Sequence, residues 1–132
     1  MNGWRWICKA AALAIHDEQV AEHGGASGLR SEALLNSALA RPAEIAAHDT
    51  GADHAVLAAS YACGILRNRP FVGGNKRTAL VVMLVFLLDN GVILTAAETE
   101  VLEIMVGAAE GTLPEDVFAA WLRRNLRLDR SD

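Results

Sequence analysis

The chain has 132 residues, which suits one domain, residues 1–132, built around one hydrophobic core. Hydrophobic residues make up 52% of the sequence and aromatic residues only 5%, a balance that favours helices over a β-sandwich. The formal net charge of −4 predicts no bulk attraction to nucleic acid or to a membrane surface, so that any anion-binding site has to be local.

The apolar segments and the cysteines predict a cytoplasmic protein. The run ALVVMLVFLL, residues 79–88, is too short for a membrane span, which needs roughly 20 residues. The N-terminal segment MNGWRWICKAAALAI continues into HDEQVAEH without a cleavage site. Cys8 and Cys63 lie far apart in apolar surroundings and are expected to be small buried hydrophobic residues in a reducing compartment.

Two helices are predicted in the N-terminal part of the chain. Apolar residues recur at helical spacing from Trp4 to Glu22, and a glycine-rich turn follows. A second helix follows Ser31 and is expected to end at Arg41–Pro42, because the residue before a proline disfavours helical backbone. Residues 42–52 are predicted to be irregular.

The middle of the chain predicts a capped third helix and a central fourth helix. Asp53 is placed to cap the third helix through its carboxylate. The fourth helix is expected from Asn75 to Asn90 and contains the run ALVVMLVFLL. Because this run is apolar on nearly every face, other helices have to surround it.

Two further helices are predicted near the C-terminus, each opened by a capping box. Thr95 with Glu98 opens the fifth helix, and Thr112 with Glu115 opens the sixth. The segment Val92–Leu94 favours β-structure but is too short for a real sheet. The fold class is therefore all-α, with about six helices around an apolar central helix.

The stretch RNRPFVGGNKRT, residues 67–78, has the composition of an anion-binding turn. Gly73 and Gly74 precede a helix N-terminus, where free amides and the helix dipole attract negative charge. Lys76 and Arg77 lie in the first turn, where the dipole normally disfavours cations, so their presence indicates a bound anion. The alternative is a glycine connection followed by a solvated Lys-Arg pair. The spacing excludes a P-loop, and no strand precedes the turn.

The sequence RNRPFVGGNKRTAL resembles the signature of the Fic/Doc family, H-x-F-x-[D/E/N]-[G/A]-N-[G/K]-R. The segment GGASGLRSEALLNSALARP is similar to the second-helix signature of the death-on-curing (Doc) branch, and the likeness covers nearly the whole chain. The resemblance implies the all-helical Fic core with the motif at the N-terminus of the central helix. It also implies that Gly74, Asn75, Lys76 and Arg77 bind phosphate and that Phe71 anchors the loop.

The resemblance further implies a Doc-type toxin of a toxin–antitoxin system. Most Fic proteins have glycine at the position of Lys76 and adenylylate their targets, whereas Doc proteins have lysine and act as kinases. The implied cofactors are ATP and Mg²⁺. The implied target is elongation factor Tu, whose modification stops translation, and the implied partner is an antitoxin with a tail that folds on the toxin.

Two positions depart from the family signature. Arg69 replaces the histidine that serves as general base, and a guanidinium has no acceptor lone pair for a proton. Gly73 replaces the acidic residue that helps to hold Mg²⁺, which needs oxygen ligands, and this puts Mg²⁺ binding in doubt. We therefore expect very little transfer activity from this chain.

Other side chains were considered as a replacement base. His16 lies in the first helix, where a structural role is the simpler interpretation. His48 and His54 lie in or beside the segment that, by resemblance, docks the target, and Asp49 and Asp53 share this position. The alternative is that these two histidines and two aspartates are solvated loop residues without a catalytic role.

The C-terminal arginines predict a basic helical edge, formed by Arg123, Arg124, Arg127 and Arg130. This edge suits an acidic antitoxin tail, or it complements the dipole at the helix C-terminus. Four functions stay open: a Doc-type toxin with inactivating changes, a natural pseudoenzyme that binds nucleotide or antitoxin, an adenylyl transferase, and a helical interaction module.

Overall fold

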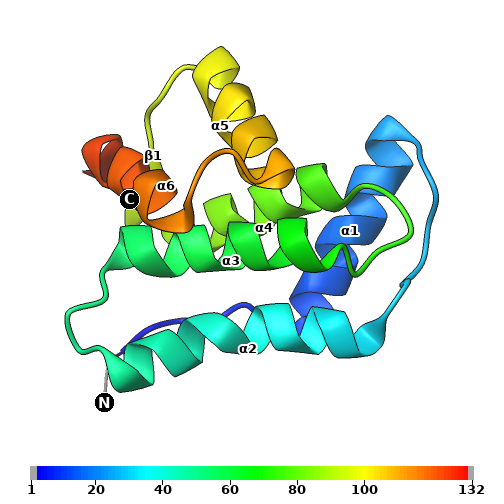
Figure 1. The fold of residues 1–132 in the computed structure, drawn as a ribbon, viewed down its shortest axis with the longest axis horizontal. Helices are drawn as coiled ribbons and strands as arrows, with labels where there is room; N and C mark the ends of the chain where they lie inside the picture. The colour runs from blue at the N-terminus through cyan, green and yellow to red at the C-terminus, as the bar shows by residue number, and fades with distance from the viewer. Residues whose placement is uncertain (1–2, 131–132) are drawn as a thin grey trace.

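The structure is a computed structural model that describes residues 3–130 (Figure 1). Over these residues the chain forms six helices and one small antiparallel sheet, in which β1 pairs with β2. The prediction of a mostly helical fold is confirmed. The elements are α1 (Lys9–His23), α2 (Glu32–His48), α3 (His54–Asn68), α4 (Asn75–Asp89), β1 (Val92–Leu94), α5 (Glu98–Glu110), α6 (Glu115–Arg124) and β2 (Leu126–Leu128).

Helices α3 and α4 share the centre of the fold (Figure 1). Helix α3 packs against α2, α4, α5 and α6, and eleven of its residues are buried. Small residues let α2 and α3 pack closely. At Gly64 of α3, even an added Cβ would lie only 3.2 Å from the Ala38 Cβ of α2. Helix α4 is less enclosed than its sequence predicts, because Leu84 and Leu88 are exposed. No helix within residues 3–130 is long and apolar enough to cross a membrane.

Helix α1 begins at Lys9, later than the predicted start at Trp4. The rings of Trp4 and Trp6 both stack on Phe86, with centroid distances of 5.9 and 6.0 Å. Residues two apart point to the same side only in extended chain, so this packing opposes a helical start. The prediction that Cys8 is buried is wrong, since it precedes α1 and is exposed, whereas Cys63 is buried as expected.

Helix α2 continues through Pro42 to His48, so the predicted end at Arg41–Pro42 is wrong. A proline removes one hydrogen-bond donor from the helix interior. Here that loss is offset by packing, because Pro42 is buried and Ile45 packs against the core. Only residues 49–53 form the connection to α3.

The cap predictions succeed only in part. Asp53 caps α3 as predicted, accepting from Val56 N at 3.0 Å. Both predicted capping boxes are wrong, because α5 and α6 begin after Ala97 and Pro114 without a side-chain cap. Thr95 Oγ1 instead donates to the carbonyl of Asn125 near the sheet, and Thr112 Oγ1 donates to the carbonyl of Gly107.

The C-terminal arginines do not share one helical edge, contrary to prediction. Helix α6 ends at Arg124, Arg127 lies on β2, and Arg130 lies beyond the strand. Arg123 Nε lies 2.6 Å from Asp53 Oδ2 and so ties α6 to the start of α3. The prediction failed because the helix does not continue past Arg124. Residues 126–128 instead form a strand that pairs with β1.

Candidate functional site

The loop that carries the motif connects α3 to α4 and is held in an uncommon backbone conformation. Arg69 ends α3 with φ 46° and ψ 58°, and among residues 3–130 it is the one non-glycine residue with positive φ. Such a conformation costs about 1–2 kcal/mol per residue. Arg30 stabilises it, because Nε donates to the Arg69 carbonyl at 2.7 Å and Nη2 donates to the Asn68 carbonyl at 2.6 Å.

The segment before α2 fastens the same loop through its backbone. The amides of Arg30 and Ser31 both donate to the carbonyl of Pro70, at 2.7 and 3.0 Å. Val72 N donates to the carbonyl of Gly28 at 3.0 Å. These bonds fasten the loop to the segment that precedes α2.

Phe71, His16 and Asn75 fix the loop from inside. The Phe71 ring is buried and stacks on His16 at 3.8 Å with an interplanar angle of 7°. His16 Nε2 lies 2.7 Å from the Gly73 carbonyl, which only accepts, so the ring donates. Asn75 Oδ1 accepts from Phe71 N at 3.0 Å, and Asn75 Nδ2 donates to the Phe71 carbonyl at 2.9 Å. His16 is therefore a buried support of the loop.

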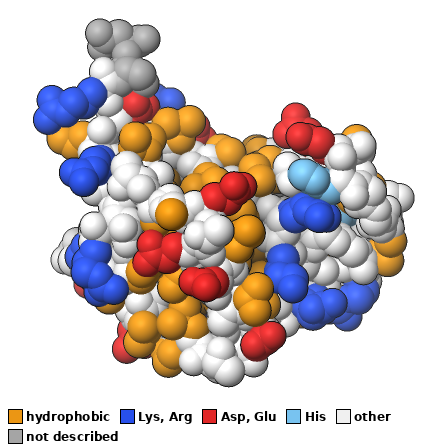
Figure 2. Space-filling model, turned by 90° about the horizontal axis from the view of Figure 1, so that it is seen from above, with side chains coloured by type: hydrophobic (Ala, Val, Ile, Leu, Met, Phe, Trp, Pro, Cys, Tyr) orange, Lys and Arg blue, Asp and Glu red, His pale blue; other side chains and the backbone are white. Residues whose placement is uncertain are grey.

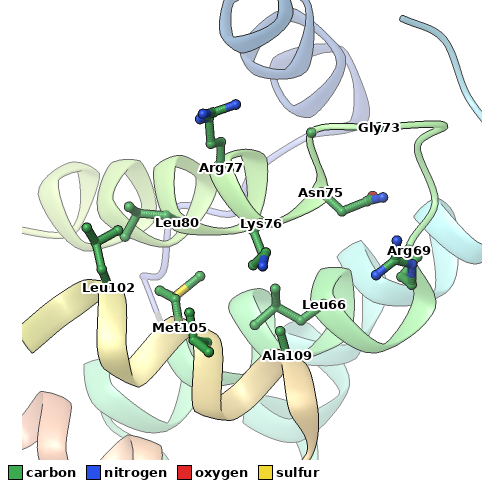
Figure 3. Close-up of a pocket in the computed structure, with 12 residues that line it drawn as sticks. Leu66, Arg69, Gly73, Asn75, Lys76, Arg77, Leu80, Leu102, Met105 and Ala109 are labelled. Atoms are coloured by element: carbon green, nitrogen blue, oxygen red, sulfur yellow. The ribbon is translucent and has the colours of Figure 1, made fainter. Parts of the chain in front are cut away.

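A cleft of about 520 Å³ lies between this loop, the first turn of α4 and one face of α5 (Figure 3). One wall is apolar and includes Leu102 and Val106 of α5, which are 50% and 41% exposed. The lining residues are Leu66, Arg69, Gly73, Gly74, Asn75, Lys76, Arg77, Leu80, Leu102, Met105, Val106 and Ala109.

The other wall of the cleft is cationic. Figure 3 shows Arg69 and Lys76 directed into the space between the loop and α5, whereas Arg77 projects from the opposite side of α4. All three side chains are exposed. The ion pairs found within residues 3–130 use the cations of Lys9, Arg41, Arg67 and Arg123 and none of these three. None of the described residues that line the cleft has a carboxylate.

The backbone adds further positive potential. The first helical bond of α4 is from Thr78 N to the Gly74 carbonyl, so the amides of the preceding turn have no helical acceptor. Gly74 adopts φ 73°, the left-handed conformation that lets the chain turn directly into the helix. Unpaired cations, free amides and an apolar wall together suit an anion with an apolar part.

The face of the molecule on the side of α5 is partly apolar. Figure 2 views the molecule from this side and shows hydrophobic side chains across the middle of the face, with Asp and Glu side chains among them. Lys and Arg side chains gather toward its edges. Leu102 and Val106 belong to the exposed apolar residues of the molecule, so the apolar wall is open to a ligand.

The structure does not bring the other candidate bases to this cleft. Asp53 and His54 lie at the start of α3, and Arg69 follows its end, about 22 Å away at the usual rise per residue. His48 and Asp49 lie at the end of α2, beside the start of α3 (Figure 1). Their contacts are structural: His54 Nε2 lies 3.0 Å from the Asn90 carbonyl, and His48 Nδ1 lies 2.8 Å from the Glu44 carbonyl.

Three features of the site were missed by the sequence analysis. The contact of His16 with the loop, the support from Arg30 and the apolar wall from α5 all join segments far apart in the chain. One available signal was the pair Leu102 and Val106, which lie one helical turn apart in a segment with glutamates on either side.

Two comparisons with known proteins agree with this architecture. The sequence model of the Fic/DOC family matches residues 6–87. The chain is 33% identical over 124 residues to "Protein kinase doc" of Escherichia phage P1, an alignment that covers 91% of this chain and 94% of that protein. The resemblance stated from the motif is thereby confirmed, and the chain belongs to the Fic/Doc family.

Proposed function

We propose that this chain is a Doc-type toxin scaffold of a toxin–antitoxin system that still binds nucleotide but has lost phosphoryl transfer. The observation that carries the proposal is the cleft itself. It keeps Lys76 of the family motif on its cationic wall, with Arg77 on the other side of α4, while Arg69 and Gly73 occupy the positions of the base and the acidic residue.

The two walls of the cleft suit the two parts of a nucleotide. Phosphate oxygens match Lys76 and the free amides at the start of α4. The apolar wall formed by Leu102, Met105 and neighbouring side chains offers surface to a base. A cleft of about 520 Å³ has the usual size for a small-molecule site.

The lost step is proton removal from the target hydroxyl. Arg69 cannot accept a proton at neutral pH. His16 is 1% exposed and donates to the loop, so it is not available to a protein substrate. Loss of a positioned general base lowers transfer by roughly 10²–10⁴-fold.

We propose ATP as the nucleotide, elongation factor Tu as the target and an antitoxin tail as the partner, because the motif with Lys76 resembles that of the Doc branch of the family. An acidic tail would complement the unpaired cations of the cleft, which lie beside the exposed apolar side chains of α5. The C-terminal arginines, which do not share one helical edge, are not needed for this contact.

Restoring both residues in one variant tests the proposal. The double variant Arg69→His with Gly73→Asp is expected to halt growth when it is expressed without an antitoxin, whereas the present chain is tolerated. Adding Arg77→Ala to the double variant provides the control, because toxicity that needs the motif disappears with it. Equal toxicity of the present chain contradicts the loss of chemistry, and a harmless double variant favours a natural pseudoenzyme.

The restored aspartate has a steric requirement. A Cβ at Gly73 would lie 3.2 Å from Ala26 N and 3.4 Å from the Ala26 carbonyl oxygen, so segment 24–28 has to move by a few tenths of an ångström. This segment is exposed and contains three glycines with positive φ, so it can move. The folded state of the variant is checked by thermal unfolding before its toxicity is scored.

A further inference from the structure

Mg²⁺ is the group that the family implies and that the residues of this cleft do not fit. Mg²⁺ binds through oxygen atoms. Among the side chains of residues 3–130 that line the cleft, only that of Asn75 contains oxygen, and this atom already accepts from Phe71 N at 3.0 Å. Within residues 3–130, no group of three or more His, Cys, Asp or Glu side chains is arranged to hold a metal ion.

The backbone oxygens at the motif glycines are also engaged. The Gly73 carbonyl, at the family's acidic position, accepts from His16 Nε2 at 2.7 Å. The Gly74 carbonyl accepts from Thr78 N at 3.0 Å. Each of these two carbonyl oxygens therefore already accepts a hydrogen bond within the protein.

Segment 24–28 closes over the place where the acidic side chain would begin. The backbone of Ala26 lies close enough to Gly73 that an added Cβ would be in a tight contact at 3.2 Å. In place of a carboxylate, the cleft contains the guanidinium of Arg69, directed toward the same space as the Lys76 ammonium (Figure 3). The local charge is therefore one that repels a divalent cation and attracts phosphate.

We propose that the cleft binds the phosphates of a nucleotide without a metal, with Arg69 providing positive charge that Mg²⁺ would otherwise provide. The inference rests on the proposed nucleotide binding. Mg²⁺ should therefore not strengthen nucleotide binding, because it lowers the negative charge of the triphosphate and competes with Arg69 for the same oxygens. Free ATP should bind at least as tightly as Mg²⁺–ATP.

The test is calorimetric titration of the full chain with ATP, once in EDTA and once in excess Mg²⁺ at matched ionic strength. We expect an affinity in EDTA that equals or exceeds the affinity in Mg²⁺. Binding that is tighter in Mg²⁺ overturns the inference and leaves nucleotide binding intact. Absence of binding under both conditions overturns the proposed nucleotide site together with the inference.

Variants locate the effect at Arg69. Arg69→Gln should weaken binding in EDTA about tenfold, which corresponds to about 1.4 kcal/mol. Arg124→Gln is the matched control, because Arg124 is also an exposed arginine without an ion pair within residues 3–130 but lies in α6, outside the cleft. An equal loss in both variants shows nonspecific attraction and refutes the role of Arg69.

The restored double variant supplies the opposite expectation. Arg69→His with Gly73→Asp removes one cation and adds a carboxylate, so ATP should now bind more tightly in Mg²⁺ than in EDTA. If the double variant and the present chain respond equally to Mg²⁺, these two residues do not determine metal use, and the inference is wrong.

Discussion

At the scale of single residues, His16 links the core to the loop that carries the motif. Its ring is 1% exposed, stacks on Phe71 and donates to the Gly73 carbonyl. A Cβ at Gly74 would also lie 3.6 Å from His16 Nε2, so the ring lies directly beneath both glycines. Isolated histidines are easily read as catalytic, but here burial makes the residue a support.

Replacing His16 with alanine should therefore loosen the loop. The change removes a buried ring and a buried hydrogen bond, and we expect the free energy of unfolding to fall by about 2–4 kcal/mol. His16→Gln retains an amide donor and should lose less. Urea denaturation compares the three proteins, and a loss below about 0.5 kcal/mol for His16→Ala would contradict the support role.

The two cysteines should differ in reactivity. Cys63 is 2% exposed, and burial raises the pKa of its thiol to about 11, so little thiolate forms at mildly alkaline pH. Cys8 is exposed. A thiol reagent should modify one cysteine in the folded protein, and Cys8→Ser should abolish this labelling. Fast modification of two thiols would show that the packing around Cys63 opens readily.

At the scale of elements, local patterns predicted helices well and helix ends less well. Asp53 was correctly predicted as a cap because the cap bond reaches only three residues along the chain. The end of α2 and the starts of α5 and α6 were predicted wrongly. At the start of α6, the hydroxyl of Thr112 instead donates to the nearby Gly107 carbonyl. The end of α2 and the start of α5 are decided by tertiary contacts, namely the burial of Pro42 and the donation from Thr95 to the Asn125 carbonyl. Such contacts have no signature in a short window of sequence.

The pair of Asp53 and Arg123 joins α3 to α6 and should make stability depend on pH. The hydrogen bond from Arg123, aided by the Val56 amide, lowers the pKa of Asp53 below its ordinary value. Since the pKa is lower in the folded state, the carboxylate stabilises the fold above its unfolded pKa. This contribution disappears as the pH falls through the folded pKa.

Asp53→Ala should therefore lower the free energy of unfolding by about 1 kcal/mol at neutral pH, mostly through the lost cap. The difference from the unchanged protein should shrink as the pH falls through the lowered pKa of Asp53 and the carboxylate becomes protonated. Denaturant titrations at several pH values measure it. A difference that grows as the pH falls would contradict the direction assigned to the pKa of Asp53.

At the scale of the whole molecule, the cleft lies between a contiguous motif and helix α5, which is distant from the motif in sequence. The motif in residues 69–77 could be identified from the sequence because its residues are contiguous in the chain and match the family signature. The apolar wall from α5 and the separation of His48 and His54 from the motif follow only from the packing of helices around α3. That packing keeps His48, Asp49, Asp53 and His54 away from the cleft, whereas His16 lies beneath the loop as a buried support.

The most direct test of the account is the transfer of label from ATP labelled at the γ-phosphate to elongation factor Tu. The present chain should transfer label at least about 10²-fold more slowly than the Arg69→His, Gly73→Asp double variant. Calorimetric titration of both proteins with ATP establishes that each is loaded during the assay. Transfer by the present chain at the rate of the double variant would contradict the claim that binding is kept and chemistry is lost.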